Sequence, residues 1–149
     1  MPSIAKRIEP EEGACIACRL CEVHCLVAHS SSRHLIKAYR EKPRPLPRVQ
    51  VEEKGPTSLA LQCRQCAEPL CVYACFTGAM NREPETGVVD VDLSRCVGCW
   101  SCIMVCPYGA IRQDLARQMV AKCDLCAGLK ALACVENCPN RALVLGEAL

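Results

Sequence analysis

The stretch that decides the fold of this chain is Cys96-Val97-Gly98-Cys99-Trp100-Ser101-Cys102-Ile103-Met104-Val105-Cys106-Pro107. Its four cysteines have the spacing C-x2-C-x2-C-x3-C, and a proline follows the last of them. The same spacing occurs once more near the N-terminus, and the related spacings C-x2-C-x4-C-x3-C and C-x2-C-x7-C-x3-C complete a fourfold repeat. The repeat uses all 16 cysteines of the 149 residues, so we expect them to serve one common purpose.

The four groups are numbered here in chain order. They are group one, Cys15, Cys18, Cys21 and Cys25; group two, Cys63, Cys66, Cys71 and Cys75; group three, Cys96, Cys99, Cys102 and Cys106; and group four, Cys123, Cys126, Cys134 and Cys138. Cysteines three apart on a tight turn can present three thiolates to three corners of one [4Fe–4S] cubane. A fourth thiolate three or four residues further on points away, which explains why such runs occur in pairs that exchange their last cysteine. The repeat predicts all sixteen as iron ligands of four [4Fe–4S] clusters.

Three other uses of the cysteines fit the sequence less well. Four zinc sites with four thiolates each would also use sixteen thiols, but zinc modules favour two separated pairs rather than triplets. Disulfides are disfavoured because cysteines this dense would pair at random. A catalytic cysteine is disfavoured because none is left over, so we expect no enzymatic site on this chain.

The composition indicates in which cellular compartment the protein works and which classes of partner it binds. A short chain with about a tenth cysteine is often a secreted disulfide scaffold, but the first twelve residues lack an apolar export segment. No apolar run is long enough to cross a bilayer, so we expect a cytoplasmic protein without a transmembrane segment. An electron-transfer subunit can also be exported on a partner's signal, and the sequence leaves that open. The net charge of +2 and the few aromatics argue against nucleic acid as a partner.

The core is expected to depend on the metal. The large aromatic side chains are few, namely Tyr39, Tyr73, Phe76, Trp100 and Tyr108. Small domains that lack a sufficient apolar core are commonly held together by metal, and their folding then depends on it. We therefore expect the clusters to act as cross-links that fill the interior.

The connectors between the groups predict short strands and helical turns. The segment 77–92 has a Pro/Gly turn and an alternating strand through Val89 and Val91, which indicates a hairpin. Residues 109–112 and 118–121 indicate a second hairpin, and residues 141–145 a strand whose candidate partner is 4–8. Helical turns are expected within 15–28 and 99–105.

The segment 30–58 differs from the rest, because it is basic and proline-rich and contains no cysteine. Its prolines Pro43, Pro45 and Pro47 favour an extended path. It is either a solvated surface insert or a docking surface for an acidic partner, since charges at the rim of an interface govern encounter. The histidines are expected at the surface or near the clusters, with His24, beside Cys25, able to donate a hydrogen bond to a cluster sulfur.

The first three cysteine groups carry a family resemblance, in the runs Cys15 to Cys25, Cys63 to Cys75 and Cys96 to Pro107. They resemble the four-cluster ferredoxin-like electron-transfer subunits of the dimethyl-sulfoxide-reductase iron–sulfur-subunit type. Within that group the chain is most similar to the small proteins that serve anaerobic carbon monoxide dehydrogenases. It also resembles subunits of tungsten aldehyde oxidoreductases, formate dehydrogenases and hydrogenases.

The resemblance implies that group one exchanges its last cysteine with group four, and group two with group three. The implied sets are Cys15, Cys18, Cys21 and Cys138; Cys123, Cys126, Cys134 and Cys25; Cys63, Cys66, Cys71 and Cys106; and Cys96, Cys99, Cys102 and Cys75. The spacing alone also allows neighbouring groups to pair. Some relatives replace the second cysteine of group three by tryptophan and carry a [3Fe–4S] cluster, but here Cys99 is present.

The expected fold is α+β, with two intertwined bacterial 2[4Fe–4S] ferredoxin-like units. One unit comprises residues 1–29 and 107–149, the second comprises 59–106, and 30–58 is the insert. The expected function is the relay of single electrons at low potential between an anaerobic redox enzyme, with carbon monoxide dehydrogenase favoured, and another carrier or enzyme. The alternatives are a fixed subunit of a tungsten aldehyde oxidoreductase, formate dehydrogenase or hydrogenase complex, and a cluster-stabilised interaction module without redox function.

Overall fold

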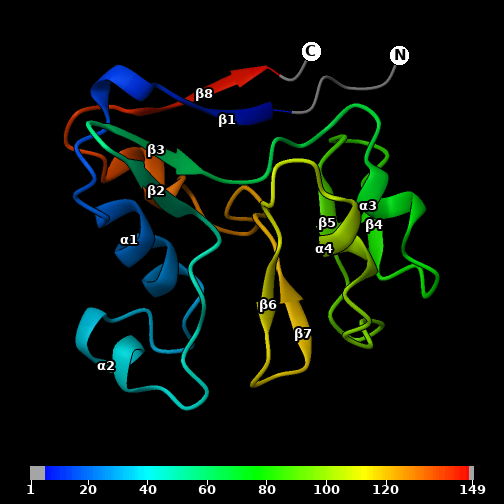
Figure 1. Ribbon diagram of the computed structural model, residues 1–149. Coiled ribbons are helices and arrows are strands. Elements are labelled where there is room, and N and C mark those ends of the chain that lie inside the picture. Colours follow the sequence, from blue (N-terminus) through cyan, green and yellow to red (C-terminus); the bar gives the residue numbers. More distant parts are fainter. Residues whose placement is uncertain (1–5, 148–149) are drawn as a thin grey trace.

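The first and last strands of the described chain pair with each other. A computed structural model describes residues 6–147, and in it strand β1 (Lys6–Pro10) pairs antiparallel with strand β8 (Leu143–Glu147), as Figure 1 shows. Ile8 lies opposite Leu145 and is 1% exposed. The predicted pairing of the two terminal segments is confirmed, although Ile4 and Ala5 of the predicted strand lie outside the described residues.

The two predicted hairpins are also present. Strands β4 (Met80–Arg82) and β5 (Val89–Val91) form the first, and β6 (Arg112–Asp114) and β7 (Met119–Ala121) form the second. The first turn is closed by the backbone N–H of Gly87, which donates to the carbonyl of Glu83. Each strand of the described chain has one antiparallel partner, so the sheets are two-stranded ribbons.

The segment 30–58 contains more regular structure than the sequence suggested. Helix α2 (Leu35–Arg40) precedes the prolines, and strand β2 (Gln50–Lys54) follows them and pairs with β3 (Thr57–Leu61). The proline stretch between them contains neither helix nor strand. Gly55 begins the two-residue loop of the β2–β3 hairpin with φ +61°, a left-handed conformation that glycine adopts without steric cost.

The remaining helices are short and carry cysteines. They are α1 (Leu20–Ala28), α3 (Leu70–Tyr73), α4 (Ser101–Val105) and α5 (Ala133–Glu136), with a 3-10 turn, η1, at Glu12–Ala14. Helix α1 packs against α5, and α3 packs against α4. The buried face of α1 consists of Cys21, Cys25 and Leu26, which are spaced so that they share one side of the helix.

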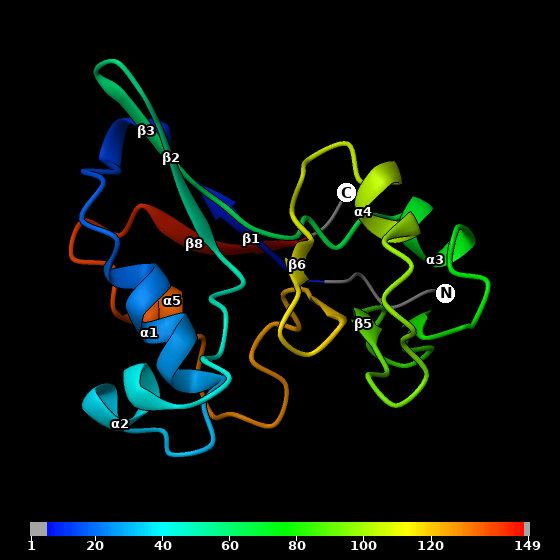
Figure 2. The ribbon, with the colours of Figure 1, turned by 60° about the horizontal axis from the view of Figure 1, so that its bottom comes forward.

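Figures 1 and 2 show two groups of elements with a hairpin between them. Helices α1 and α2 lie with β1, β2, β3 and β8 on one side, and α3 and α4 lie with β5 on the other. The β6–β7 hairpin lies between the two sides. No helix among the described residues is long and apolar enough to span a membrane.

Cysteines make up much of the buried core. The first core contains Cys21, Cys25, Cys63, Cys123 and Cys134 together with a few aliphatic side chains, among them Ile8, Val49, Val51 and Leu143. The second core is smaller and consists of Met80, Val89, Cys102, Ile111 and Val120. Short helices and strands around such cores fit the predicted α+β class. Ile111 and Val120 pack with residues of the middle of the chain, and the division into two ferredoxin-like units stays a prediction.

Removal of iron should abolish cooperative folding. The thiols in the first core have few large apolar neighbours, so without metal the interior buries little apolar surface to offset the conformational entropy of the chain. We expect the metal-free, reduced chain to show no cooperative thermal transition in circular dichroism, whereas the iron-loaded protein shows one. A well-dispersed amide NMR spectrum of the metal-free chain would contradict this expectation.

Candidate metal centres

Each cysteine group begins with the same backbone turn. The residue directly before the second cysteine has a left-handed conformation, with φ between +48° and +67°; these residues are Ala17, Gln65, Gly98 and Leu125. A non-glycine residue seldom adopts this conformation, because its Cβ crowds the backbone. Its recurrence in all four groups indicates that the turn is what directs the first two thiols of a group toward one point.

Gly98 shows how tightly one of these turns is packed. A Cβ at this position would lie 2.4 Å from the carbonyl oxygen of Gln118, which belongs to the loop before β7. Backbone atoms cannot move aside as a flexible side chain can, so the position admits only glycine. The group-three turn is therefore held directly against the β6–β7 hairpin.

Two cavities are each lined by three cysteines of one group and the last cysteine of another. The first cavity is lined by Cys63, Cys66, Cys71 and Cys106. The second is lined by Cys15, Cys18, Cys21 and Cys138. The structure thus brings together thiols that are far apart in the sequence, in the combinations that the resemblance implied.

Electrostatic influences among the other eight cysteines favour two further sets. Burial raises the pKa of Cys134, and the nearby thiols of Cys123, Cys25 and Cys126 add to this effect. Burial likewise raises the pKa of Cys102 to about 11, with contributions from Cys71, Cys96 and Cys75. Cys99 is exposed, and its electrostatic neighbour among the thiols is also Cys75.

Backbone amides donate hydrogen bonds to the last cysteine of three groups. The N–H of Arg48 lies 3.1 Å from the Sγ of Cys25, that of Met80 lies 3.3 Å from Cys75, and that of Ala142 lies 3.2 Å from Cys138. A donor at sulfur stabilises the thiolate, which is the form that binds metal. In iron–sulfur proteins such donors also tune the reduction potential.

The donor set fits iron–sulfur clusters better than single ions. Among residues 6–147, no three His, Cys, Asp or Glu side chains gather closely enough to hold one metal ion. The thiols instead surround cavities, as a polynuclear group with one thiolate per iron requires. Burial raises the pKa of Cys21 to about 12, so this thiol is protonated in the metal-free chain and ligation releases its proton.

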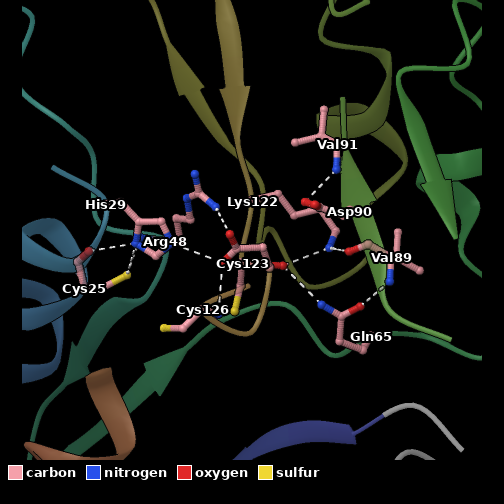
Figure 3. A network of polar contacts seen from close by, with 11 residues as sticks. Cys25, His29, Arg48, Gln65, Val89, Asp90, Val91, Lys122, Cys123 and Cys126 are labelled. Atoms are coloured by element: carbon pink, nitrogen blue, oxygen red, sulfur yellow. Dashed lines mark hydrogen bonds and ion pairs between the residues drawn. The ribbon is translucent and has the colours of Figure 1, made fainter. Parts of the chain in front are cut away.

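The histidine that reaches a cysteine sulfur among the described residues is His29, and the hydrogen bond from His24 to a cluster sulfur stays a prediction. His29 follows Cys25 by four residues and so lies on the same face of α1, whereas His24 is rotated away from Cys25. Its Nδ1 lies 2.8 Å from the carbonyl oxygen of Cys25 and 3.7 Å from its Sγ (Figure 3). Its Nε2 lies 3.1 Å from the carboxylate of Asp124.

The carboxylate of Asp124 also forms an ion pair with Arg48, with 2.9 Å between Oδ2 and Nη1. It accepts a hydrogen bond from the backbone N–H of Cys126 as well. Burial by itself would raise the pKa of Asp124, but the hydrogen bond from His29 and the charge of Arg48 lower it to about 2. Burial by itself would lower the pKa of His29, but its bonds to Asp124 and Cys25 raise it to about 9. Arg48 of the basic segment is therefore engaged inside the protein, in a charged network beside Cys25, Cys123 and Cys126.

Comparison with known proteins agrees with iron–sulfur clusters as the bound group. Residues 57–148 match the family described as 4Fe-4S dicluster domain. The chain belongs to this family. It is 37% identical over 145 residues to an iron–sulfur protein of Rhodospirillum rubrum, an alignment that covers 87% of this chain and 75% of the relative. It is 36% identical over 148 residues to the electron transport protein HydN of Escherichia coli strain K12, covering 87% of this chain and 81% of HydN.

A solved structure shares the fold. The chain resembles a chain of the active-site complex BamBC of benzoyl coenzyme A reductase, with a TM-score of 0.52 and 24% identity, covering 97% of this chain and 80% of the other. Membership of the dicluster family and the cysteine motifs establish that this is an electron-transfer iron–sulfur protein that binds [4Fe–4S] clusters.

The neighbours of Cys25 predict which cluster depends on it. Replacement of Cys25 by serine should perturb the cluster of Cys123, Cys126 and Cys134 and leave that of Cys15, Cys18 and Cys21 comparatively intact. Iron content and electron paramagnetic resonance of Cys25→Ser, compared with Cys15→Ser, would show two different centres affected. The same centre affected in both variants would show that group one keeps its fourth thiol.

Proposed function

We propose that this protein is a wire of four [4Fe–4S] clusters that relays single electrons between two redox partners and catalyses no reaction itself. The observation that carries the proposal is the composition of the two thiol-lined cavities, each with three cysteines of one group and one of another. The ligand sets are those that the resemblance implied, and the neighbours of Cys134 and Cys102 support the remaining two sets.

Electrostatic proximity between thiols of different sets supports a linear order of the clusters. Cys21 of the Cys15 set is an electrostatic neighbour of Cys134, Cys123 is a neighbour of Cys63, and Cys71 is a neighbour of Cys102. The proposed order is therefore the sets named by their first thiols, Cys15, Cys123, Cys63 and Cys96. The exposed thiols Cys18 and Cys99 belong to the first and last of these sets, which supports these two clusters as the proposed points of electron entry and exit.

The favoured partner is an anaerobic redox enzyme of the carbon monoxide dehydrogenase class, on the strength of the sequence resemblance. A fixed subunit of a tungsten aldehyde oxidoreductase, formate dehydrogenase or hydrogenase complex is the alternative. Native mass spectrometry of the complex purified from cells distinguishes the two, because a fixed subunit copurifies in a constant ratio with its enzyme.

The metal content tests the wire. Four cubanes require about sixteen iron atoms and as much acid-labile sulfide per chain. Anaerobic analysis should give these values without zinc, and a low-potential reductant should bleach the visible absorption reversibly. About eight iron atoms, or zinc in stoichiometric amount, would contradict the proposal, and absorption that no reductant changes would leave only a structural role for the clusters.

The basic segment is proposed as the surface that guides the partner. Arg33, Lys37, Arg40, Lys42 and Arg44 are exposed, whereas Arg48 is held by Asp124. Arg44 lies over the ring of Tyr39, and the backbone carbonyls of Pro43 and Arg44 accept hydrogen bonds from Arg117, so the segment is fixed to the body of the protein. A fixed array of exposed charges suits electrostatic steering.

Reversing Arg40, Lys42 and Arg44 to glutamate should slow electron transfer with the physiological enzyme. Steering by exposed charges weakens with salt, so we expect a decrease of about tenfold at low ionic strength that shrinks as salt is added. Stopped-flow transfer rates at several ionic strengths measure this, with iron content as the control. Unchanged rates at low salt would mean that the segment is only a solvated covering.

A further inference from the structure

Lys122 is a cation buried without an anion. Its side chain is 0% exposed, and its Nζ donates hydrogen bonds to the backbone carbonyls of Val89 and Cys123 (Figure 3). In the part of the chain that the structure describes, it forms no ion pair with a carboxylate. Carbonyl oxygens satisfy ammonium hydrogens but carry no net charge, and a buried charge without a counter-charge is costly.

The residues around Lys122 show where an anion that balances its charge would lie. Its side chain lines the cavity that Cys63, Cys66, Cys71 and Cys106 also line. Burial raises the pKa of Cys71, and the nearby ammonium of Lys122 opposes that rise. An anionic group in this cavity would therefore lie beside the buried ammonium.

We propose that Lys122 is the fixed counter-charge of the cluster held by Cys63, Cys66, Cys71 and Cys106. The inference rests on the ligand set of the proposed function. A cubane with four thiolates is a net anion and becomes more negative when it takes up an electron. A fixed cation beside it stabilises the reduced form more than the oxidised form, and so raises its reduction potential.

Gln65 keeps the ammonium in place. Its side chain is 0% exposed; its Nε2 donates to the carbonyl of Cys123 at 3.1 Å, and its Oε1 accepts the N–H of Val89 at 2.7 Å. The two residues whose carbonyls receive the Lys122 hydrogens are thus tied to each other by one amide, as Figure 3 shows. Gln65 is also the left-handed residue of group two, so the same turn directs the thiols and fixes the cation.

A purely structural role for Lys122 is the competing explanation, because its hydrogen bonds join the β5 strand to group four. The two explanations differ in what they require. A purely structural role requires only the hydrogen bonds of Lys122. A counter-charge requires its positive charge, and it changes the reduction potential of one cluster.

The experiment compares Lys122→Met, Lys122→Arg and the exposed control Lys54→Met in the iron-loaded protein. Potentials are measured by dithionite titration followed by electron paramagnetic resonance, and the affected centre is identified with a Cys71→Ser reference. At a fixed solution potential, Lys122→Met should lower the reduced-to-oxidised ratio of that cluster about tenfold or more, a shift of about 59 mV for one electron. Lys122→Arg should stay within about threefold of the wild type, and Lys54→Met should leave the ratio unchanged, since exposed charges are screened.

Each outcome decides the question. An unchanged potential in a fully loaded Lys122→Met protein overturns the proposal. Where Lys122→Met loses iron, Lys122→Gln replaces it, because glutamine keeps a hydrogen-bond donor without the positive charge. A lowered potential in iron-loaded Lys122→Gln supports the proposal, and an unchanged potential overturns it. Failure of the four-cluster function itself would appear separately, as a low iron content in the wild-type protein.

Discussion

The last thiol of a closely spaced cysteine run lies beside the first three thiols of a different run, and the arrangement of distant segments follows from that constraint. The left-handed turns direct the early thiols of each group, while the last thiol lies beside a different group. Cys21 and Cys138, at opposite ends of the sequence, therefore line one cavity. The pairing of β1 with β8 and the packing of α1 on α5 hold the N-terminal and C-terminal cysteine groups next to each other.

Much of the fold could be predicted because its signals are local. The alternation at Val89 and Val91 and the turn before it specify the β4–β5 hairpin without reference to the remainder of the chain. Helix α2 and strand β2 had no comparable signal, because α2 has no side-chain cap and the residues of β2 are mostly charged. Tertiary contacts stabilise them: Ala38 is buried, and Val51 packs in the first core while its N–H donates to the carboxylate of Glu22.

The site divides in the same way. Spacing alone predicts the cysteines as ligands, because the chemistry of a cubane restricts how its thiolates can be spaced. The polar residues around them could not be found from spacing, since their positions depend on the packing of distant segments. His29 reaches Cys25 from the C-terminal end of α1, and the buried ammonium of Lys122 is held by the carbonyls of Val89 and Cys123. The one local sign that Lys122 is unusual is its place in the sequence, directly between the apolar residues of β7 and Cys123.

The β1–β8 ribbon has a consequence for how the protein is made. A chain leaves the ribosome from its N-terminus, at about 5–20 residues per second, and domains fold as their residues emerge. The cavity of Cys63 and Cys106 has all its thiols once residue 106 has emerged, whereas the cavity of Cys15 must wait for Cys138 and for β8 to reach β1. The thiols of group one that line this cavity therefore stay open to oxidants and to competing metals until the segment that carries Cys138 has been synthesised.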